Sequence, residues 1–195
     1  MLIDAPARGL SREKVLSLAA DFAPGLVACD TSTPSIYNDA AVAGSLKEIL
    51  PRSTVVLVGT HPTALPEETL SLAPGADAVA LGEYDFTLRD LARCLSSGGN
   101  PSAVAGLCLR RGEVFVRTPA RPLIEDLDSL PFLSRTYRRH LDIREYYFAA
   151  ADYPVIPIIS ARGCPPRCFS CVSPPTFHGR RFSPRTPGTV AEDSP

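Results

Sequence analysis

Thr54-Val55-Val56-Leu57-Val58-Gly59-Thr60-His61-Pro62 is the stretch that decides the fold of this 195-residue chain. Its first five residues are β-branched or leucine, and a run that is apolar on both faces is typical of a parallel strand buried between helices. The glycine and proline that follow are typical of a loop from a strand to a helix. Residues 26–29 and 76–81 repeat this pattern. The sequence therefore predicts several parallel strands, each followed by a loop.

Helical segments alternate with these strands. Ser11 is expected to cap a helix over residues 12–22, where apolar side chains recur at helical spacing. Further helices are predicted over residues 40–50, from Pro66 onward, and over residues 86–95. An alternation of strands and helices predicts an α/β fold with a doubly wound parallel sheet.

The chain opens on Leu2-Ile3-Asp4, which looks like the end of a strand, and enters a helix almost at once. A doubly wound domain ordinarily begins with a complete strand and helix. We therefore expect residues 1–97 to form such a domain without its front part.

Three loops follow the predicted strands at their carboxyl ends, which is where open α/β sheets bind ligands. The candidate ligand-binding residues in them are Thr31, Ser32, Thr33, Gly59, Thr60, His61, Gly82 and Glu83. Loops of this composition are also common as ordinary turns, so both interpretations are open at this point. We interpret His61 as a hydrogen-bonding residue of its loop.

A β-hairpin and a connector are predicted for residues 98–153. Residues 104–110 and 113–117 flank a turn at Arg111-Gly112, as two arms of a hairpin do. Residues 154–160 are apolar again and predict a buried strand. We expect residues 154–195 to begin an α/β barrel. Such a barrel needs on the order of 200 residues, so most of it is expected to lie outside this sequence.

Overall charge gives no reason to expect a polyanionic partner. The chain has 20 basic and 21 acidic residues, for a net charge of −1. Neither nucleic acid nor an anionic membrane would be attracted electrostatically. No apolar run approaches the roughly 18 residues that a membrane span needs, and the N-terminus lacks the pattern of a signal peptide. We expect a cytoplasmic protein with no nucleic-acid partner.

Six cysteines fall into two groups. Cys29, Cys94 and Cys108 are scattered among apolar residues and are interpreted as small buried side chains. The others stand in Arg162-Gly163-Cys164-Pro165-Pro166-Arg167-Cys168-Phe169-Ser170-Cys171, with the spacing C-x3-C-x2-C. Three cysteines so close together in a reducing compartment indicate a metal or redox site.

The thiolates of Cys164, Cys168 and Cys171 can hold three corners of a 4Fe–4S cluster and leave the fourth iron open. Arg162 and Arg167 add positive charge that would favour the thiolates. A Cys3His zinc site with His178 is the alternative. We favour iron–sulfur because paired C-x2-C motifs are the more common zinc pattern, and no second pair exists here.

This cysteine spacing after a predicted strand resembles the radical S-adenosylmethionine enzymes. The resemblance implies that the open iron binds S-adenosylmethionine and that cleavage gives a 5′-deoxyadenosyl radical. It also implies a small-molecule or lipid substrate and an electron donor such as flavodoxin or ferredoxin. In that family an aromatic residue usually precedes the last cysteine. Here Ser170 holds that position, so Phe169 is the candidate for packing on the adenine.

The whole chain further resembles the cobalamin-binding-domain subfamily of these enzymes. The resemblance is carried by Thr31-Ser32-Thr33-Pro34-Ser35, by Gly59-Thr60-His61-Pro62, by the loop from Gly82 to Thr87, and by Glu125-Asp126-Leu127-Asp128-Ser129-Leu130-Pro131. It implies cobalamin as a further cofactor. Three stretches resemble the hopanoid-biosynthesis branch, which implies a hopanoid side chain as substrate. They are Leu2-Ile3-Asp4-Ala5-Pro6, Ser32-Thr33-Pro34-Ser35 and Leu141-Asp142-Ile143-Arg144-Glu145-Tyr146-Tyr147.

Two other function classes fit the same sequence. The chain could be a non-catalytic module that binds cobalamin or a nucleotide, as doubly wound domains often are, or a structural protein stabilised by zinc. We assign no catalytic residue. Because most of the barrel is expected to be missing, we expect this stretch alone not to turn over S-adenosylmethionine.

Overall fold

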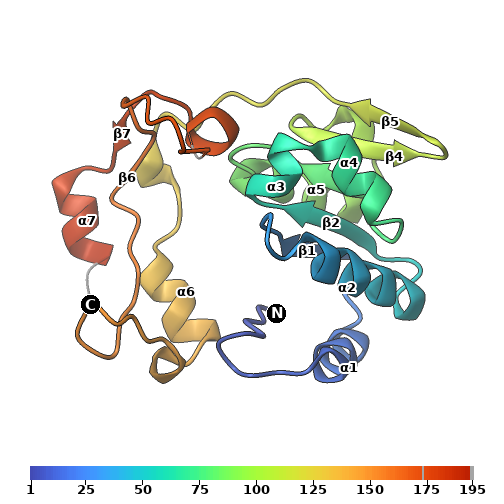
Figure 1. Cartoon of the computed structure of the whole chain (residues 1–195), viewed down its shortest axis with the longest axis horizontal. Coiled ribbons are helices and arrows are strands. Elements are labelled where there is room, and N and C mark those ends of the chain that lie inside the picture. The colour runs from blue at the N-terminus through green and yellow to red at the C-terminus, as the bar shows by residue number, and fades with distance from the viewer. Residues whose placement is uncertain (173, 194–195) are drawn as a thin grey trace.

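One five-stranded sheet dominates the computed structural model, which describes residues 1–172 and 174–193 (Figure 1). Its strands follow the chain order: β1 (Leu26–Asp30), β2 (Thr54–Val58), β3 (Ala78–Ala80), β4 (Leu107–Arg111) and β5 (Val114–Arg117). β1, β2 and β3 are parallel, whereas β4 and β5 are antiparallel to their neighbours. The predicted α/β class with parallel strands is confirmed.

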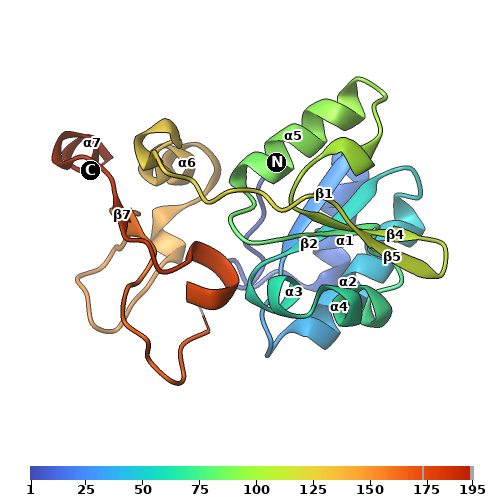
Figure 2. The same ribbon diagram turned by 90° about the horizontal axis from the view of Figure 1, so that it is seen from above.

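Helices cover both faces of the sheet, with α5 opposite the others in Figure 2. The first face packs against α1 (Arg12–Phe22), α2 (Ile36–Ile49) and α4 (Pro66–Leu72), and the second against α5 (Asp85–Ser96). Val55 and Leu57 of β2 point to the first face, whereas Val56 and Val58 point to the second. Side chains of a strand alternate between faces, so an apolar run such as β2 supplies both cores.

The helix boundaries follow from local chemistry. α1 begins where predicted, because the Ser11 hydroxyl accepts a hydrogen bond from the Lys14 amide at 3.3 Å. α2 begins four residues before the predicted start, and Ile36, its first residue, is buried. Burial of that side chain outweighs the polar composition of the turn before it.

The hairpin extends the sheet of the first domain. The predicted hairpin is confirmed as β4 and β5. β4 also pairs with β3 through Val79 and Cys108, so the hairpin belongs to the five-stranded sheet and not to the separate segment 98–153 in which we placed it. Cys108 lies in the core, which explains why its strand docks there.

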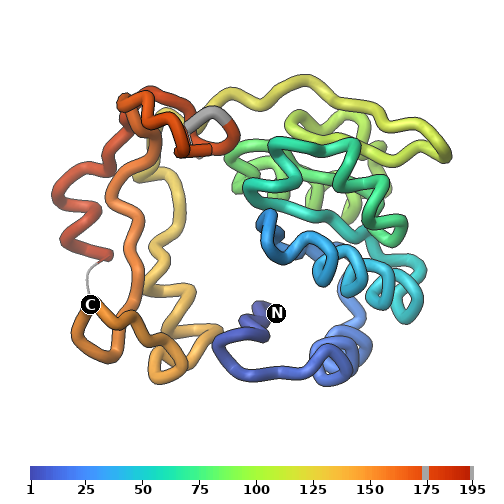
Figure 3. The backbone as a smooth tube through the Cα atoms, in the orientation of Figure 1, coloured from blue at the N-terminus to red at the C-terminus, as the bar shows by residue number. Residues whose placement is uncertain are grey.

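The remaining elements are short. They are α3 (Thr60–Ala64), α6 (Leu133–His140), α7 (Pro187–Asp193), β6 (Ala161–Arg162), β7 (Ser183–Pro184) and the single turns η1 (Pro101–Ala103), η2 (Leu127–Ser129), η3 (Ile143–Glu145) and η4 (Pro174–His178). After β5 the chain leaves the sheet and forms a second region around α6, α7, β6 and β7, as the tube in Figure 3 shows.

Two predicted strands are wrong. Leu2-Ile3-Asp4 is not a strand, because among the described residues no strand lies beside it. A hollow of about 590 Å³ separates this segment from the outer edge of β1. Residues 154–160 are also not a strand, and only Ala161–Arg162 pairs, with β7. Pro154 and Pro157 have no amide hydrogen for a ladder, and Ile158 is partly exposed rather than buried.

None of the helices in the described part of the chain is long and apolar enough to cross a membrane.

Candidate functional site

The first two loops at the carboxyl ends of the strands touch through their backbones. The amide of Thr31, just after β1, donates to the Val58 carbonyl at 2.8 Å. Gly59 follows β2 with φ of 112° and ψ of −168°, a conformation that is essentially restricted to glycine. A Cβ atom there would overlap the Thr31 carbonyl oxygen. Gly59 is therefore required by a close approach of the two loops.

His61 links the same two loops through its side chain. Its Nδ1 lies 3.2 Å from the Thr33 hydroxyl, and the residue is buried. Its Nε2 is also buried and has no hydrogen-bond partner among the described residues. The ring thus makes the loop hydrogen bond that we expected of it, and it does not present a nitrogen to the surface.

The third loop joins the other two through Thr63. The Gly82 amide donates to the Thr63 hydroxyl at 3.1 Å, and that hydroxyl donates to the Gly59 carbonyl at 2.8 Å. Of the predicted polar residues, Ser32 and Thr33 are exposed, Thr60 is half-buried and Thr31 is buried. The three loops therefore form one surface, on which Ser32, Thr33 and Thr60 are accessible to a ligand.

Glu83 was predicted with these loop residues but faces a different part of the chain. Its side chain is 3% exposed. The Ile124 amide donates to its Oε2 at 2.6 Å, and His178 Nδ1 lies 3.0 Å from its Oε1. Arg162 Nη1 lies 3.6 Å from the same Oε1. All of these partners come from the second region, so Glu83 connects the sheet to that region.

Asp85 holds the Arg162 guanidinium in a two-pronged ion pair. Arg162 Nη1 donates to Oδ2 at 2.8 Å and Nη2 donates to Oδ1 at 3.1 Å. The Arg162 side chain is only 9% exposed. Its charge, which we expected to favour the cysteine thiolates, is therefore paired with carboxylates instead.

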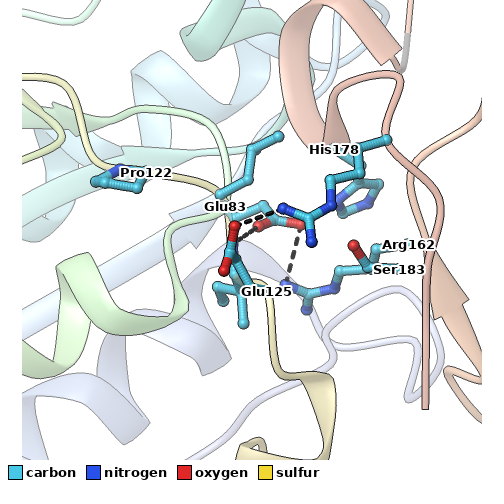
Figure 4. A pocket seen from close by; sticks show the side chains of 9 residues that line it. Glu83, Pro122, Glu125, Arg162, His178 and Ser183 are labelled. Atoms are coloured by element: carbon cyan, nitrogen blue, oxygen red, sulfur yellow. Dashed lines mark hydrogen bonds and ion pairs between the residues drawn. The ribbon is translucent and has the colours of Figure 1, made fainter.

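A cavity of about 260 Å³ lies at this junction, and Figure 4 shows the charged side chains that converge on it. The residues that line it are Glu83, Pro122, Leu123, Ile124, Glu125, Arg162, His178, Arg181 and Ser183. The cavity therefore lies between the third carboxyl-end loop and the cysteine-bearing segment.

An aromatic contact adds to the junction. The rings of Tyr84 and Phe177 meet edge to face, with centroids 5.4 Å apart. Burial raises the pKa of the Tyr84 hydroxyl to about 12, and the nearby Asp30 and Asp85 carboxylates add to that effect. η4, which carries Phe177, also packs against α3. The segment after the cysteines thus lies over the carboxyl-end loops.

The three clustered cysteines lie on an exposed loop. Cys164, Cys168 and Cys171 are all solvent-exposed free thiols, and the Cys171 amide donates to the Cys168 carbonyl at 3.4 Å. Within the part of the chain that the structure describes, no three His, Cys, Asp or Glu side chains are grouped closely enough to hold a metal ion. Phe169 is fully exposed. Three cysteine thiols are the ligands that an iron–sulfur cluster takes. In this structure the three side chains are not gathered around one point.

His178 does not join the cysteines. Its Nδ1 lies 3.0 Å from Glu83 Oε1, so this nitrogen is paired with a carboxylate. This arrangement disfavours the alternative in which His178 completes a Cys3His zinc site.

The scattered cysteines differ from the clustered ones. Burial raises the pKa of the Cys29 thiol to about 11 and also raises the pKa of the Cys108 thiol. Both thiols are thus protonated and unreactive near neutral pH. Cys108 is buried as expected, whereas Cys29 and Cys94 are half-buried.

Known proteins are similar to both regions of the chain. Residues 2–92 match the B12 binding domain family. This part of the chain is therefore similar to B12-binding domains. The match covers the sheet through β3 together with most of α5, and so includes all three carboxyl-end loops.

Similarity to curated relatives extends further along the sequence. An uncharacterized methyltransferase from Pyrococcus horikoshii is 30% identical over 192 residues, which are 98% of this chain and 40% of the relative. The anaerobic magnesium-protoporphyrin IX monomethyl ester cyclase of Rubrivivax gelatinosus is 30% identical over 176 residues, or 88% of this chain and 31% of the cyclase. The chain therefore spans less than half of each relative.

Solved structures share the fold. The radical S-adenosylmethionine methyltransferase TsrM from Kitasatospora setae, with cobalamin and a [4Fe-4S] cluster bound, has a TM-score of 0.71 at 18% identity, over 98% of this chain and 38% of TsrM. The cobalamin-dependent S-adenosylmethionine radical enzyme OxsB has a TM-score of 0.74 at 16% identity, over 98% of this chain and 25% of OxsB. The similarity to both covers the second region as well as the sheet.

The junction residues were not found from the sequence. Glu83, Tyr84 and Asp85 lie in the loop that we compared with cobalamin-side loops, but no contact with the cysteine-bearing segment was predicted for them or for Phe177. The charge of Arg162 could have indicated the junction. Arg162 follows an apolar stretch, and an arginine that is buried there needs a carboxylate partner.

Proposed function

We propose that this chain is the cobalamin-binding domain and the cluster-bearing start of the catalytic domain of a radical S-adenosylmethionine enzyme. The observation that carries the proposal is the junction of Arg162 with Asp85. This ion pair joins the segment immediately before Cys164 to the loop surface of a B12-binding domain. Cofactors held on these two segments would therefore be linked through this ion pair.

Cobalamin would lie on the carboxyl-end loops of the sheet. The side chains available to it are Ser32, Thr33 and Thr60. Gly82 is half-buried, and its lack of a side chain would allow a large ring system to approach the backbone there. His61 would support the loop and would not ligate cobalt, since its Nδ1 is bonded and its Nε2 is buried.

Cys164, Cys168 and Cys171 would hold a 4Fe–4S cluster. When bound, that cluster would supply the electron for reductive cleavage of S-adenosylmethionine at its open iron. This chain would contribute the three thiolates, the positive charge of Arg167, and the exposed ring of Phe169 for the adenine. An electron donor such as flavodoxin or ferredoxin would be needed, and free thiols suit a cytoplasmic setting.

The names of the relatives indicate the type of reaction and, for one of them, the substrate. Their names describe a methyltransferase and a cyclase that acts on a magnesium-protoporphyrin ester. The hopanoid side chain stays a prediction from short sequence motifs. So does the division into residues 1–97, 98–153 and 154–195, except that the hairpin shares the sheet of the first part.

Electron paramagnetic resonance tests the proposal on the full chain. The protein is reconstituted anaerobically with iron and sulfide, reduced, and titrated with S-adenosylmethionine. We expect a 4Fe–4S signal that changes on titration, and a triple Cys164→Ala, Cys168→Ala, Cys171→Ala variant without that signal. An iron-free preparation that holds zinc would refute the cluster, and a signal unaffected by S-adenosylmethionine would refute the open iron.

A further inference from the structure

Arg162 is an arginine that lies almost fully out of solvent, two residues before Cys164. Its side chain is 9% exposed, and its two terminal nitrogens donate to the two Asp85 oxygens at 2.8 and 3.1 Å. Two parallel bonds between a guanidinium and a carboxylate fix orientation as well as distance. The backbone at Arg162 is thus held at a defined place relative to the start of α5.

Glu83 provides a second carboxylate for the same guanidinium. Its side chain is 3% exposed, and its Oε1 lies 3.6 Å from Arg162 Nη1. The same oxygen lies 3.0 Å from His178 Nδ1, while Oε2 accepts from the Ile124 amide at 2.6 Å. A buried carboxylate with this many partners is costly to leave unpaired. We refer to Glu83, Asp85, Arg162 and His178 as the clamp.

The clamp joins two segments, each of which is proposed to bind a different cofactor. Glu83 directly follows Gly82, the glycine of the third carboxyl-end loop, and Asp85 is the first residue of α5 two positions later. Arg162 precedes Gly163, where a Cβ atom would overlap the Arg181 carbonyl oxygen, so the turn into Cys164 is also tightly constrained. A contact that joins these segments sets how the cysteine loop is oriented toward the loop surface.

We propose that Arg162 is a positioning residue, which holds the cysteine loop at a fixed distance from the cobalamin-side loops through Asp85 and Glu83. This inference rests on the proposed function. Arg162 would touch neither cofactor. Its effect would be on the relation between them, and it would leave the capacity of either segment to bind its own cofactor unchanged.

Hydrogen–deuterium exchange of the chain without cofactors tests the contact itself. We expect Arg162→Gln to increase exchange at least tenfold in peptides from residues 160–185, with β2 unchanged. The matched control is Arg117→Gln, which removes an exposed two-pronged pair with Glu67 that joins β5 to α4 and includes no residue of 160–185, so exchange in that segment should be unaffected. Wild-type exchange in the Arg162 variant would overturn the proposal.

Spin relaxation in the loaded chain tests the positioning. A reduced cluster close to cob(II)alamin speeds the relaxation of the cobalt signal, and the enhancement falls steeply with distance. We expect Arg162→Gln to lose most of this enhancement while iron and cobalamin contents stay within twofold of wild type, and Arg162→Lys to restore part of it. An unchanged enhancement would overturn the proposal, and so would a loss of either cofactor, which would make Arg162 a binding residue.

The two experiments distinguish failure of this proposal from failure of the proposed function. A wild-type chain that takes up no cluster and no cobalamin would refute the proposed function. Hydrogen exchange alone would then decide whether the clamp holds the cysteine loop.

Discussion

The backbone of Gly59 lies so close to the carbonyl oxygen of Thr31 that a Cβ atom on Gly59 would overlap it. The two residues follow β1 and β2, and their contact brings two of the three candidate ligand loops together. The φ of 112° at Gly59 adds a second requirement for glycine. This contact is therefore a structural feature on which the loop surface depends.

Replacing Gly59 by alanine should destabilise the protein by about 3 kcal/mol, from backbone strain together with a steric clash. Urea unfolding followed by circular dichroism measures this change. Gly98→Ala is the matched control, because Gly98 also has a positive φ, of 67°, but has open space around it. Its cost should be about 1 kcal/mol. Equal effects of the two substitutions would contradict the close approach.

The six cysteines should divide into reactive and unreactive groups. At pH 8, Cys164, Cys168 and Cys171 should be alkylated by iodoacetamide within minutes, because they are exposed. Cys29, with a pKa of about 11, should be only about one part in a thousand thiolate and should react after unfolding. Peptide mass spectrometry measures each site. Labelling of Cys29 at the rate of Cys168 would contradict its burial.

His61 should not ligate cobalt. The cobalt signal of bound cob(II)alamin should lack splitting from a His61 nitrogen, because Nδ1 is bonded to Thr33 and Nε2 is buried. His61→Gln should retain cobalamin with an unchanged spectrum, since the glutamine amide can also form a hydrogen bond with the Thr33 hydroxyl. Nitrogen splitting that disappears in the variant would show that the histidine turns toward the cobalt.

Asp30 should lower the free energy of unfolding in a pH-dependent way. Partial burial, together with the negative charge of Asp39, raises the pKa of Asp30. A carboxyl whose pKa is raised on folding favours the folded state below its unfolded pKa, and this contribution is lost as the pH rises through the folded pKa. Asp30→Asn should therefore be more stable than wild type at pH 7 and similar to it below about pH 4.

Urea unfolding at the two pH values measures the Asp30 difference. Asp152→Asn, at an exposed site in the connector, is the control and should change stability at neither pH. A stability gain for Asp30→Asn that is the same at both pH values would contradict the assignment of the effect to a titrating carboxyl.

Local pattern predicted the central part of the fold well. β2 lies at Thr54–Val58 and α1 at Arg12–Phe22, as expected, because an unbroken apolar run and a serine cap are strong local signals. Leu2-Ile3-Asp4 and residues 154–160 are equally apolar but form no strand. A strand depends on a neighbour that can pair with its backbone, and sequence pattern does not report whether that neighbour is present.

The candidate site was predicted in part for the same reason. Close contact of the three loops follows from topology, since carboxyl ends of parallel strands share one edge. The pairing of Glu83 and Arg162, by contrast, joins positions far apart in the chain. Nothing in the loop motif distinguishes a glutamate that faces a ligand from one that faces an arginine.

The most direct test of the account is the content of both cofactors in one preparation. The chain is reconstituted anaerobically with iron, sulfide and hydroxocobalamin, passed through a desalting column, and analysed for iron, zinc and cobalt. Wild type should retain about four irons per chain together with bound cobalamin, and the triple cysteine variant should retain cobalamin but no iron. A wild-type chain that elutes without cobalt, or with zinc in place of iron, would contradict the account.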